Sequence, residues 1–224
     1  MNIKGEIPSK DNTSGNEEVI DIPIGINIMS IDNKFYTPEE WDTLTNVVAE
    51  GVSINTGEHS FILSAELLGN GVILLPNYSF FDELPDYITT FPSDDAKLDF
   101  NGEQNTNNLI CWLKEFNEDI LNIESNLALF YVNNYRFPSG ANGYLLSAGE
   151  MRIVVINRTE IHNALTKIGG HITSNTRACR TSTLQSADYG YIATTGIKGI
   201  TSLLNTATHP SNQGQALKVM VARK

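Results

Sequence analysis

The spacing of apolar residues changes twice along the chain, and this feature constrains the fold more than any other. Four isoleucines near the start recur at every second position, which is typical of a half-buried strand: Ile22, Ile24, Ile26 and Ile28. Between about residues 105 and 170 the spacing becomes three or four residues, as on the buried face of a helix. After Thr173, short apolar runs return among Thr, Ser, Gly and Asn. We therefore expect an α+β fold, with the helices segregated from antiparallel β hairpins that carry long loops.

Cap residues predict where the helices begin and end. Thr37 and Glu40, around Pro38, form a capping box, and Ser147 and Glu150 form a second one. The stripe of Leu109, Ile110, Leu113 and Phe116 predicts a helix that starts at residue 105 or 106. Two more helices are expected, one across residues 127–135 and one that Thr159 caps and Gly169-Gly170 ends.

Turn residues predict hairpins in the first part of the chain. Asp32-Asn33 precedes a short strand at Phe35-Tyr36, and Asn55-Thr56-Gly57 is the expected turn of a hairpin over residues 51–65. The stretch 69–99 is rich in Pro and Asp, and we expect it to be irregular and exposed. The 24 Asn residues of the chain suit such turns, caps and loops.

The formal net charge of −11 is unevenly distributed. Residues 1–135 carry 5 Lys and Arg against 23 Asp and Glu, whereas residues 136–224 carry 10 against 3. One interpretation is two surfaces with different partners, or two faces that pair between copies of the chain. The other is a drift in composition along one solvated surface. The acidic balance argues against nucleic-acid binding, which needs a basic face.

The first 20 residues are polar and predict a flexible arm that would order only against a partner. They contain no apolar stretch of the kind found in export signals, so we expect synthesis in a cytoplasm without a signal peptide. No run approaches the ~18 apolar residues of a membrane span, which argues against membrane insertion. Cys111 and Cys179 are expected to be buried thiols, and a disulfide between them is the alternative.

Several sequence blocks resemble one known family. Residues 142–151, NGYLLSAGEM, resemble the G-Y-L-P-S-x-G-E-L block of C-type-lectin-like domains in proteins of gut Bacteroides-type bacteria and their crAss-like bacteriophages. Downstream, Asn157 and Gly169-Gly170 also match, and Ile161-His162-Asn163-Ala164-Leu165 resembles the family's I-N-x-A-L stretch. Upstream, Asp99-Phe100-Asn101-Gly102 with Asn105-Thr106 resembles its D-Y-N-G-x-x-N-T. Phe35-Tyr36-Thr37, Glu40-Trp41, Gly51-Val52 and Phe61-Ile62 resemble the N-terminal hairpin region of the family. The resemblance covers residues from about 25 to 170.

The resemblance implies a C-type-lectin-like domain over residues 21–224, with a hairpin and helix part at 21–100 and a lectin-like core at 101–224. This sequence departs from the family at Leu146, where Pro is usual, and at residues 179–183, CRTST, where the family often has Y-W-S-S-T. The Glu-Pro-Asn and Gln-Pro-Asp tripeptides of calcium-dependent lectins are absent. Formylglycine-generating enzymes share the broader fold and use a cysteine pair, but Cys111 and Cys179 lie in no matching context.

Family members on phage particles resemble fibre, capsid decoration or receptor-binding proteins, and those on bacteria resemble surface adhesins. The resemblance and the signal-free polar arm together favour a non-enzymatic virion protein of the head or tail, assembled in the host cytoplasm. Residues 1–20 would anchor it to capsid or tail scaffold proteins, and a dimer or trimer is expected. The alternative is a bacterial cell-surface adhesin that binds carbohydrate.

No catalytic or metal-binding pattern stands out, and we expect no cofactor. The four His residues, His59, His162, His171 and His209, lack metal-ligand spacing. Ser147 is explained as a helix cap rather than a nucleophile. The acidic pairs Asp82-Glu83 and Asp94-Asp95 lack the pattern of a calcium loop, and we interpret them as solvated charges.

Binding residues are expected on loops of the C-terminal part, because loops on a rigid sheet commonly carry contacts. Amphipathic rings and hydrogen-bonding groups there suit a host polysaccharide or a protein partner: Arg180, Tyr189, Tyr191, Asn205, His209, Asn212 and Gln213. The alternative is that Tyr189 and Tyr191 pack on the core as strand residues. The basic character of this end would suit a partner with carboxylate sugars or an acidic face of a second copy.

Overall fold

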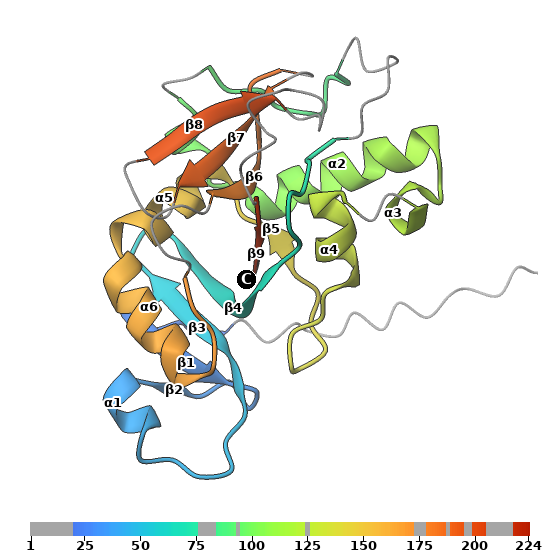
Figure 1. Cartoon of the computed structure of the whole chain (residues 1–224). Coiled ribbons are helices and arrows are strands. Elements are labelled where there is room, and N and C mark those ends of the chain that lie inside the picture. Colours follow the sequence, from blue (N-terminus) through green and yellow to red (C-terminus); the bar gives the residue numbers. More distant parts are fainter. Residues whose placement is uncertain are drawn as a thin grey trace, which may run out of the picture.

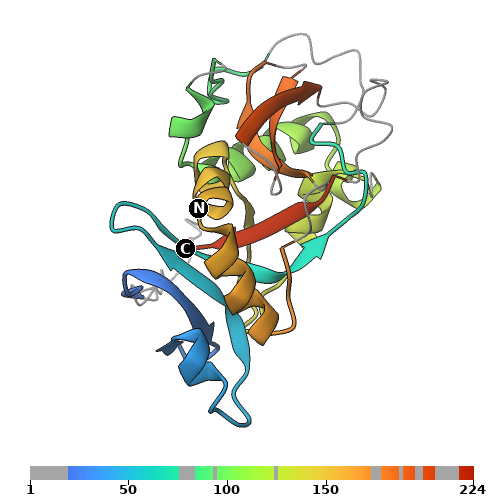
Figure 2. The ribbon, with the colours of Figure 1, turned by 60° about the vertical axis from the view of Figure 1, so that its left-hand side comes forward.

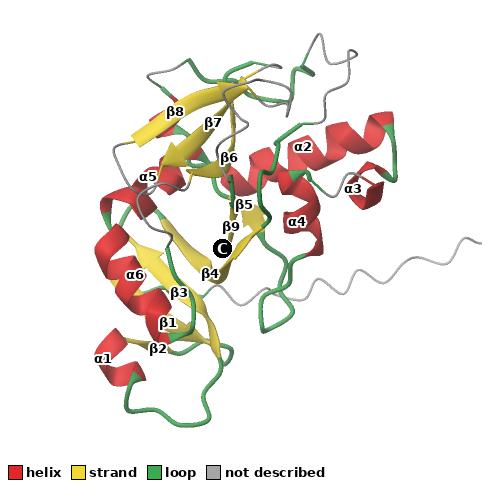
Figure 3. Ribbon diagram, viewed as in Figure 1, coloured by secondary structure: helices red, strands yellow, loops and turns green. Residues whose placement is uncertain are grey.

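A computed structural model describes residues 20–75, 84–92, 95–123, 126–172, 178–186, 189–194, 199–204 and 217–224. These residues form helices and two sheets whose strands pair antiparallel, which confirms the α+β class (Figure 3). The arm predicted at residues 1–20 lies outside the described residues except for Ile20.

The larger sheet has six strands in the order β2-β1-β3-β4-β9-β5. Its strands are β1 (Gly25–Ser30), β2 (Phe35–Tyr36), β3 (Ala49–Asn55), β4 (Ser60–Leu68), β5 (Tyr144–Leu145) and β9 (Val219–Arg223). Strand β9 lies between β4 and β5, with Leu63 opposite Ala222 and Tyr144 also opposite Ala222. The sheet therefore joins strands from residues 21–100 with strands from residues 101–224.

The smaller sheet contains β6 (Ala178–Leu184), β7 (Tyr189–Thr194) and β8 (Gly199–Leu204). Its strand β6 also hydrogen-bonds to the residue before β9: the Arg180 amide donates to the Lys218 carbonyl, and the Lys218 amide donates to the Ala178 carbonyl, both at 3.0 Å. The two sheets are thus joined by backbone hydrogen bonds. Figures 1 and 2 place the smaller sheet at one end of the molecule and α1 with β1 and β2 at the other.

The first helix is α1 (Pro38–Trp41), and the other helices lie in the middle of the chain. They are α2 (Gly102–Phe116), α3 (Ile120–Ile123), α4 (Ala128–Asn134), α5 (Ala148–Ile156) and α6 (Arg158–Lys167), and a short 3₁₀ helix, η1 (Ala96–Leu98), precedes them. Helices α5 and α6 lie on one side of the six-stranded sheet, and α2 and α4 lie on the other (Figure 1).

Both faces of the six-stranded sheet are covered by helices. Neighbouring residues of a strand point to opposite faces, so each strand contributes to two apolar clusters. In β9, Val219 and Val221 belong to the apolar cluster with α2 and α4, whereas Met220 and Ala222 belong to the cluster with α5 and α6. Strand β4 alternates in the same way. Helices that are contiguous in sequence therefore cover both faces of one sheet.

Both predicted capping boxes are confirmed. The Thr37 amide donates to Glu40 Oε2 at 2.8 Å, and the Ser147 amide donates to Glu150 Oε2 at 2.8 Å. The predicted helix end at Gly169 is also confirmed, with a φ of 79° there. The Gly170 amide donates to the Leu165 carbonyl at 2.8 Å, which closes the last turn.

The hairpin of β3 and β4 is confirmed as well, with Gly57 at φ 90° and its amide donating to Asn55 Oδ1 at 2.7 Å. The helix predicted across residues 127–135 is α4, and the helix predicted from residue 105 or 106 is α2, which begins three residues earlier at Gly102.

The alternation of the four isoleucines predicts that all of them face the core from one strand, and this prediction was wrong for Ile24. Ile22 and Ile28 are buried, but Ile24 is 79% exposed. The reason is Gly25, whose φ of 108° turns the backbone, so that the strand begins only there and Ile24 lies on no strand.

Three other expectations were wrong. Asn157, not Thr159, precedes the first residue of α6. Residues 72–75 are irregular but buried, since they pack in the cluster between the sheet and α4. Cys111 is exposed on α2, although Cys179 is buried as expected, and both are free thiols rather than a disulfide.

Candidate functional site

The predicted binding residues do not form one surface in the part of the chain that the structure describes. Tyr189 is 43% exposed at the start of β7, but Arg180 and Tyr191 are each only 1% exposed. Asn205, His209, Asn212 and Gln213 lie outside the described residues.

Arg180 is buried because β6 is covered on both faces, and all seven of its residues are buried. Its Nε donates to the Val72 carbonyl at 3.2 Å, and burial lowers the pKa of its guanidinium to about 10. Tyr191 packs as a strand residue, and its hydroxyl donates to the Phe91 carbonyl at 3.0 Å. A surface role for Arg180 and Tyr191 is therefore corrected to a place in the core.

A cluster of buried polar side chains is joined by hydrogen bonds between the loop before α2, β6 and the start of α5. At its centre lies Asp99, which is fully buried. Asp99 Oδ2 accepts from Thr183 Oγ1 at 2.6 Å and from Asn105 Nδ2 at 2.7 Å. Its backbone carbonyl accepts from Ser147 Oγ at 2.6 Å and from the Gly149 amide at 2.9 Å. Asp99, three residues before the start of α2, thereby connects β6 to the start of α5.

Glu150 extends this cluster toward the surface. Its carboxylate is 1% exposed and accepts from the Ser147 amide at 2.8 Å, from the Tyr144 hydroxyl at 3.0 Å and from Lys224 Nζ at 3.2 Å. Burial, together with the neighbouring Glu150 charge, raises the pKa of Tyr144, so its phenol stays protonated and donates. The carboxylate is paired and hydrogen-bonded, as a buried charge requires.

Two glycines, Gly102 and Gly149, allow this close packing, and Gly143 allows the loop before β5 to pack on β9. A Cβ on Gly102 would lie 2.1 Å from Glu150 Oε2, and one on Gly149 would lie 2.3 Å from the Asp99 carbonyl oxygen. At Gly143 it would lie 2.1 Å from Val221 Cγ1. These glycines stand in the sequence blocks that carry the family resemblance, and the structure gives each a steric reason.

The chemistry of this cluster is structural. Asp99, Ser147 and Thr183 have no exposed surface, and their oxygens are engaged with backbone amides, a backbone carbonyl or each other. A substrate has no access to Ser147, whose hydroxyl acts as the helix cap predicted for it. The sequence analysis singled out these residues within separate motifs. It did not predict that residues more than 80 positions apart would contact one another.

Sequence reasoning missed a polar hollow of about 790 Å³ on the other side of Tyr144. It lies between the turn after β1, the start of α2, the loop before β5 and the end of β9. We define the polar hollow by the residues that carry its chemistry: Asn33, Glu103, Asn107, Asn142, Arg223 and Lys224. Glu103 and Asn107 lie four residues apart on one face of α2, but the sequence predicted a helix only from residue 105 or 106, so Glu103 was not placed on it.

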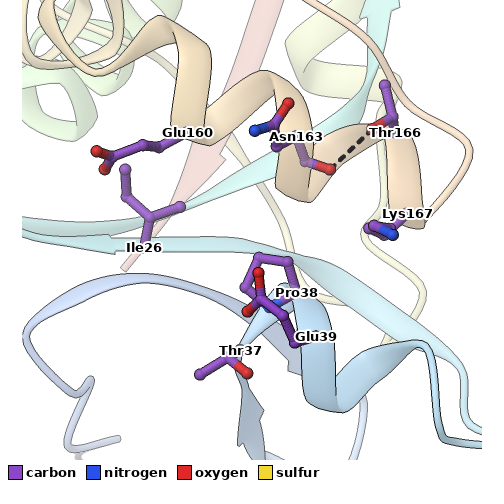
Figure 4. A pocket seen from close by; sticks show the side chains of 8 residues that line it. All are labelled: Ile26, Thr37, Pro38, Glu39, Glu160, Asn163, Thr166 and Lys167. Atoms are coloured by element: carbon purple, nitrogen blue, oxygen red, sulfur yellow. Dashed lines mark hydrogen bonds between the residues drawn. The ribbon is translucent and has the colours of Figure 1, made fainter.

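A second hollow, of about 450 Å³, separates α6 from α1 (Figure 4). Ile26 and Pro38 lie on one side of it, and Glu160, Asn163 and Lys167 project from α6 on the other. Lys167 pairs with Asp42, which links α6 to the end of α1.

Among the described residues, no group of three or more His, Cys, Asp or Glu side chains is placed to hold a metal ion. Of the acidic pairs noted in the sequence, Asp82, Glu83 and Asp94 fall outside the described ranges. No helix in the described part of the chain is long and apolar enough to cross a membrane.

Comparison with known proteins found no match: no family model, no curated protein and no solved structure matches this chain.

Proposed function

We propose that the protein is a non-enzymatic structural protein of a phage particle, a head or tail fibre or a capsid decoration. Its body would be a C-type-lectin-like module for attachment to the host surface or to other virion subunits. Residues 1–20 would anchor it to a capsid or tail scaffold protein, and it would assemble in the host cytoplasm as a dimer or trimer.

The observation that carries this proposal is the convergence of the resemblance residues. Asp99 and Gly102 stand in one sequence block, and Ser147, Gly149 and Glu150 stand in another; the two blocks meet in one buried cluster. Blocks of this kind are expected to persist when they hold a scaffold together. The cluster therefore supports the family likeness as a likeness of fold, and the role is carried over from the family by analogy.

Deleting residues 1–20 tests the anchor. We expect the shortened protein to fold, because its core is built from residue 22 onward, but to be missing from purified particles of a phage that encodes it. Circular dichroism would check the fold, and immunoblotting of particles would check incorporation.

Normal incorporation of the shortened protein would refute the anchor. Absence of the full-length protein from particles, with its detection on a bacterial surface instead, would refute the virion proposal and favour a carbohydrate-binding adhesin.

A further inference from the structure

We propose that the polar hollow is a binding site for a neutral sugar. This inference rests on the attachment role proposed above and names a ligand class and a place for it. Four segments that are far apart in sequence line the hollow, and its volume of about 790 Å³ falls in the range of small-ligand sites.

Two residues that line the hollow, Ser139 and Arg223, are held in place by the buried Glu50. Glu50 is 2% exposed, and its carboxylate accepts from Ser139 Oγ at 2.6 Å and from the Ser139 amide at 2.9 Å. Arg223 Nε lies 2.9 Å from Glu50 Oε1, and the guanidinium carbon lies 5.8 Å from the centre of the Phe137 ring. These two residues would lose little entropy on binding, because they are already held in place.

Unused hydrogen-bonding groups also line the hollow. The side chains of Asn33, Asn107, Asn142 and Glu103 make no hydrogen bond to any residue that the structure describes, and all four residues are exposed. Each amide both donates and accepts, as a sugar hydroxyl does. Adjacent hydroxyls of a sugar ring therefore match amides and a carboxylate grouped around one hollow.

The charges favour a neutral ligand. Arg223 is already paired with the buried Glu50, and Lys224 is paired with the buried Glu150. The Glu103 carboxylate also lines the hollow, and it forms no ion pair with any residue that the structure describes. The described residues that line the hollow thus provide no surplus positive charge to attract a uronate, a sialate or a phosphate.

The apolar lining fits a sugar better than a nucleobase. Ile20, Ile31 and Ala141 offer aliphatic surface for the C–H faces of a pyranose ring. Among the described residues of the lining, Tyr144 carries the one aromatic ring, and this residue is only 3% exposed. A base would need an open aromatic face on which to stack.

The test applies the full chain to an array with neutral gluco-, galacto- and manno-oligosaccharides and with oligosaccharides that contain uronic or sialic acid. We expect binding to one or more neutral sugars and not to the acidic set. Asn107→Ala and Asn142→Ala should each weaken that affinity about tenfold, because each removes a direct hydrogen bond from a site made of few.

Asn163→Ala is the matched control, because Asn163 is an equally exposed asparagine in the second hollow. It should leave sugar binding unchanged. Binding to acidic sugars only, no binding to any arrayed sugar, or equal weakening by all three substitutions would each overturn the proposal. Particle incorporation of Asn107→Ala is measured separately: loss of sugar binding with normal incorporation separates this site from the proposed virion role.

Discussion

Thr183 connects three segments of the chain through one hydroxyl group. Its Oγ1 donates to Asp99 Oδ2 at 2.6 Å and accepts from the Ala148 amide at 2.8 Å. All three residues are fully buried. Without this hydroxyl, a buried carboxylate would lose a donor and a buried amide would lose its acceptor, which costs more than the hydrogen bonds contribute when made.

Thr183→Val should therefore lower the free energy of unfolding by about 2–4 kcal/mol, since valine keeps the shape and removes both hydrogen bonds. Chemical denaturation measures the change. Thr166→Val is the control: Thr166 is exposed on α6, and its hydroxyl donates to the Asn163 carbonyl, so a change of only about 0.5 kcal/mol is expected. Equal effects of the two substitutions would contradict the structural role of the cluster.

For single residues, the sequence predicted correctly those roles that depend only on residues a few positions away in the chain. Ser147 and Glu150 form the expected capping box because the two residues are three positions apart. Arg180 could not be placed in the same way. Its burial depends on Val72 and on the strand that follows Leu217, which are distant in sequence. The polar hollow was missed for the same reason, because its residues meet only in the folded chain.

Strand β6 is an element with no solvent-facing side, since β7 lies along one edge, the backbone at Lys218 lies along the other, and all its residues are buried. An ionised group within it is therefore unfavourable. Burial raises the pKa of the Cys179 thiol to about 12 from an ordinary value of 9.0.

The sign of the resulting pH dependence follows from the raised pKa. The unfolded chain loses the thiol proton above pH 9.0, while the folded chain keeps it up to about 12, so stability falls as pH rises through this window. At a pH one unit above the unfolded pKa, we expect the loss from Cys179 to be about 1.4 kcal/mol. Denaturation at neutral and alkaline pH under reducing conditions measures it.

Cys179→Ala should reduce this alkaline loss of stability, whatever its effect at neutral pH. Cys111→Ala should leave the loss as in the wild type, because Cys111 is exposed on α2. The same pH dependence in both variants would show that the Cys179 thiolate is tolerated inside β6.

Most elements were predictable where local signals agree. Strands β3 and β4 follow from their turn at Gly57, and α6 ends where two glycines permit the closing hydrogen bonds. The order of strands in the sheets was not predictable. The position of β9 between β4 and β5 depends on pairing over about 155 residues, for which the sequence carries no local signal.

The uneven charge of the chain is partly balanced inside the molecule. Asp42 and Glu50, from the acidic first part, pair with Lys167 and Arg223 from the basic second part. Neither of the two interpretations made from the sequence included pairing within one chain. The Arg223–Glu50 pair is the buried member, with side chains 14% and 0% exposed.

Arg223→Met should destabilise the protein by about 3–5 kcal/mol, because it leaves the Glu50 carboxylate buried without its cation. Thermal or chemical unfolding measures the effect. Lys34→Met is the control, since it breaks the exposed Lys34–Asp32 pair and should leave the midpoint nearly unchanged. A mild effect of Arg223→Met, similar to that of the control, would contradict internal balancing of charge as a source of stability.

The position of β9 has a consequence for how the chain is made. Strand β4 ends at Leu68, and its partner β9 begins at Val219, so a ribosome must add about 150 residues before the six-stranded sheet can close. Until then the edge of β4 is an unpaired, largely apolar strand, the kind of segment that pairs with other nascent chains. Completion of the six-stranded sheet thus waits until β9 has been made, and chaperone binding to nascent β4 would be most useful during that interval.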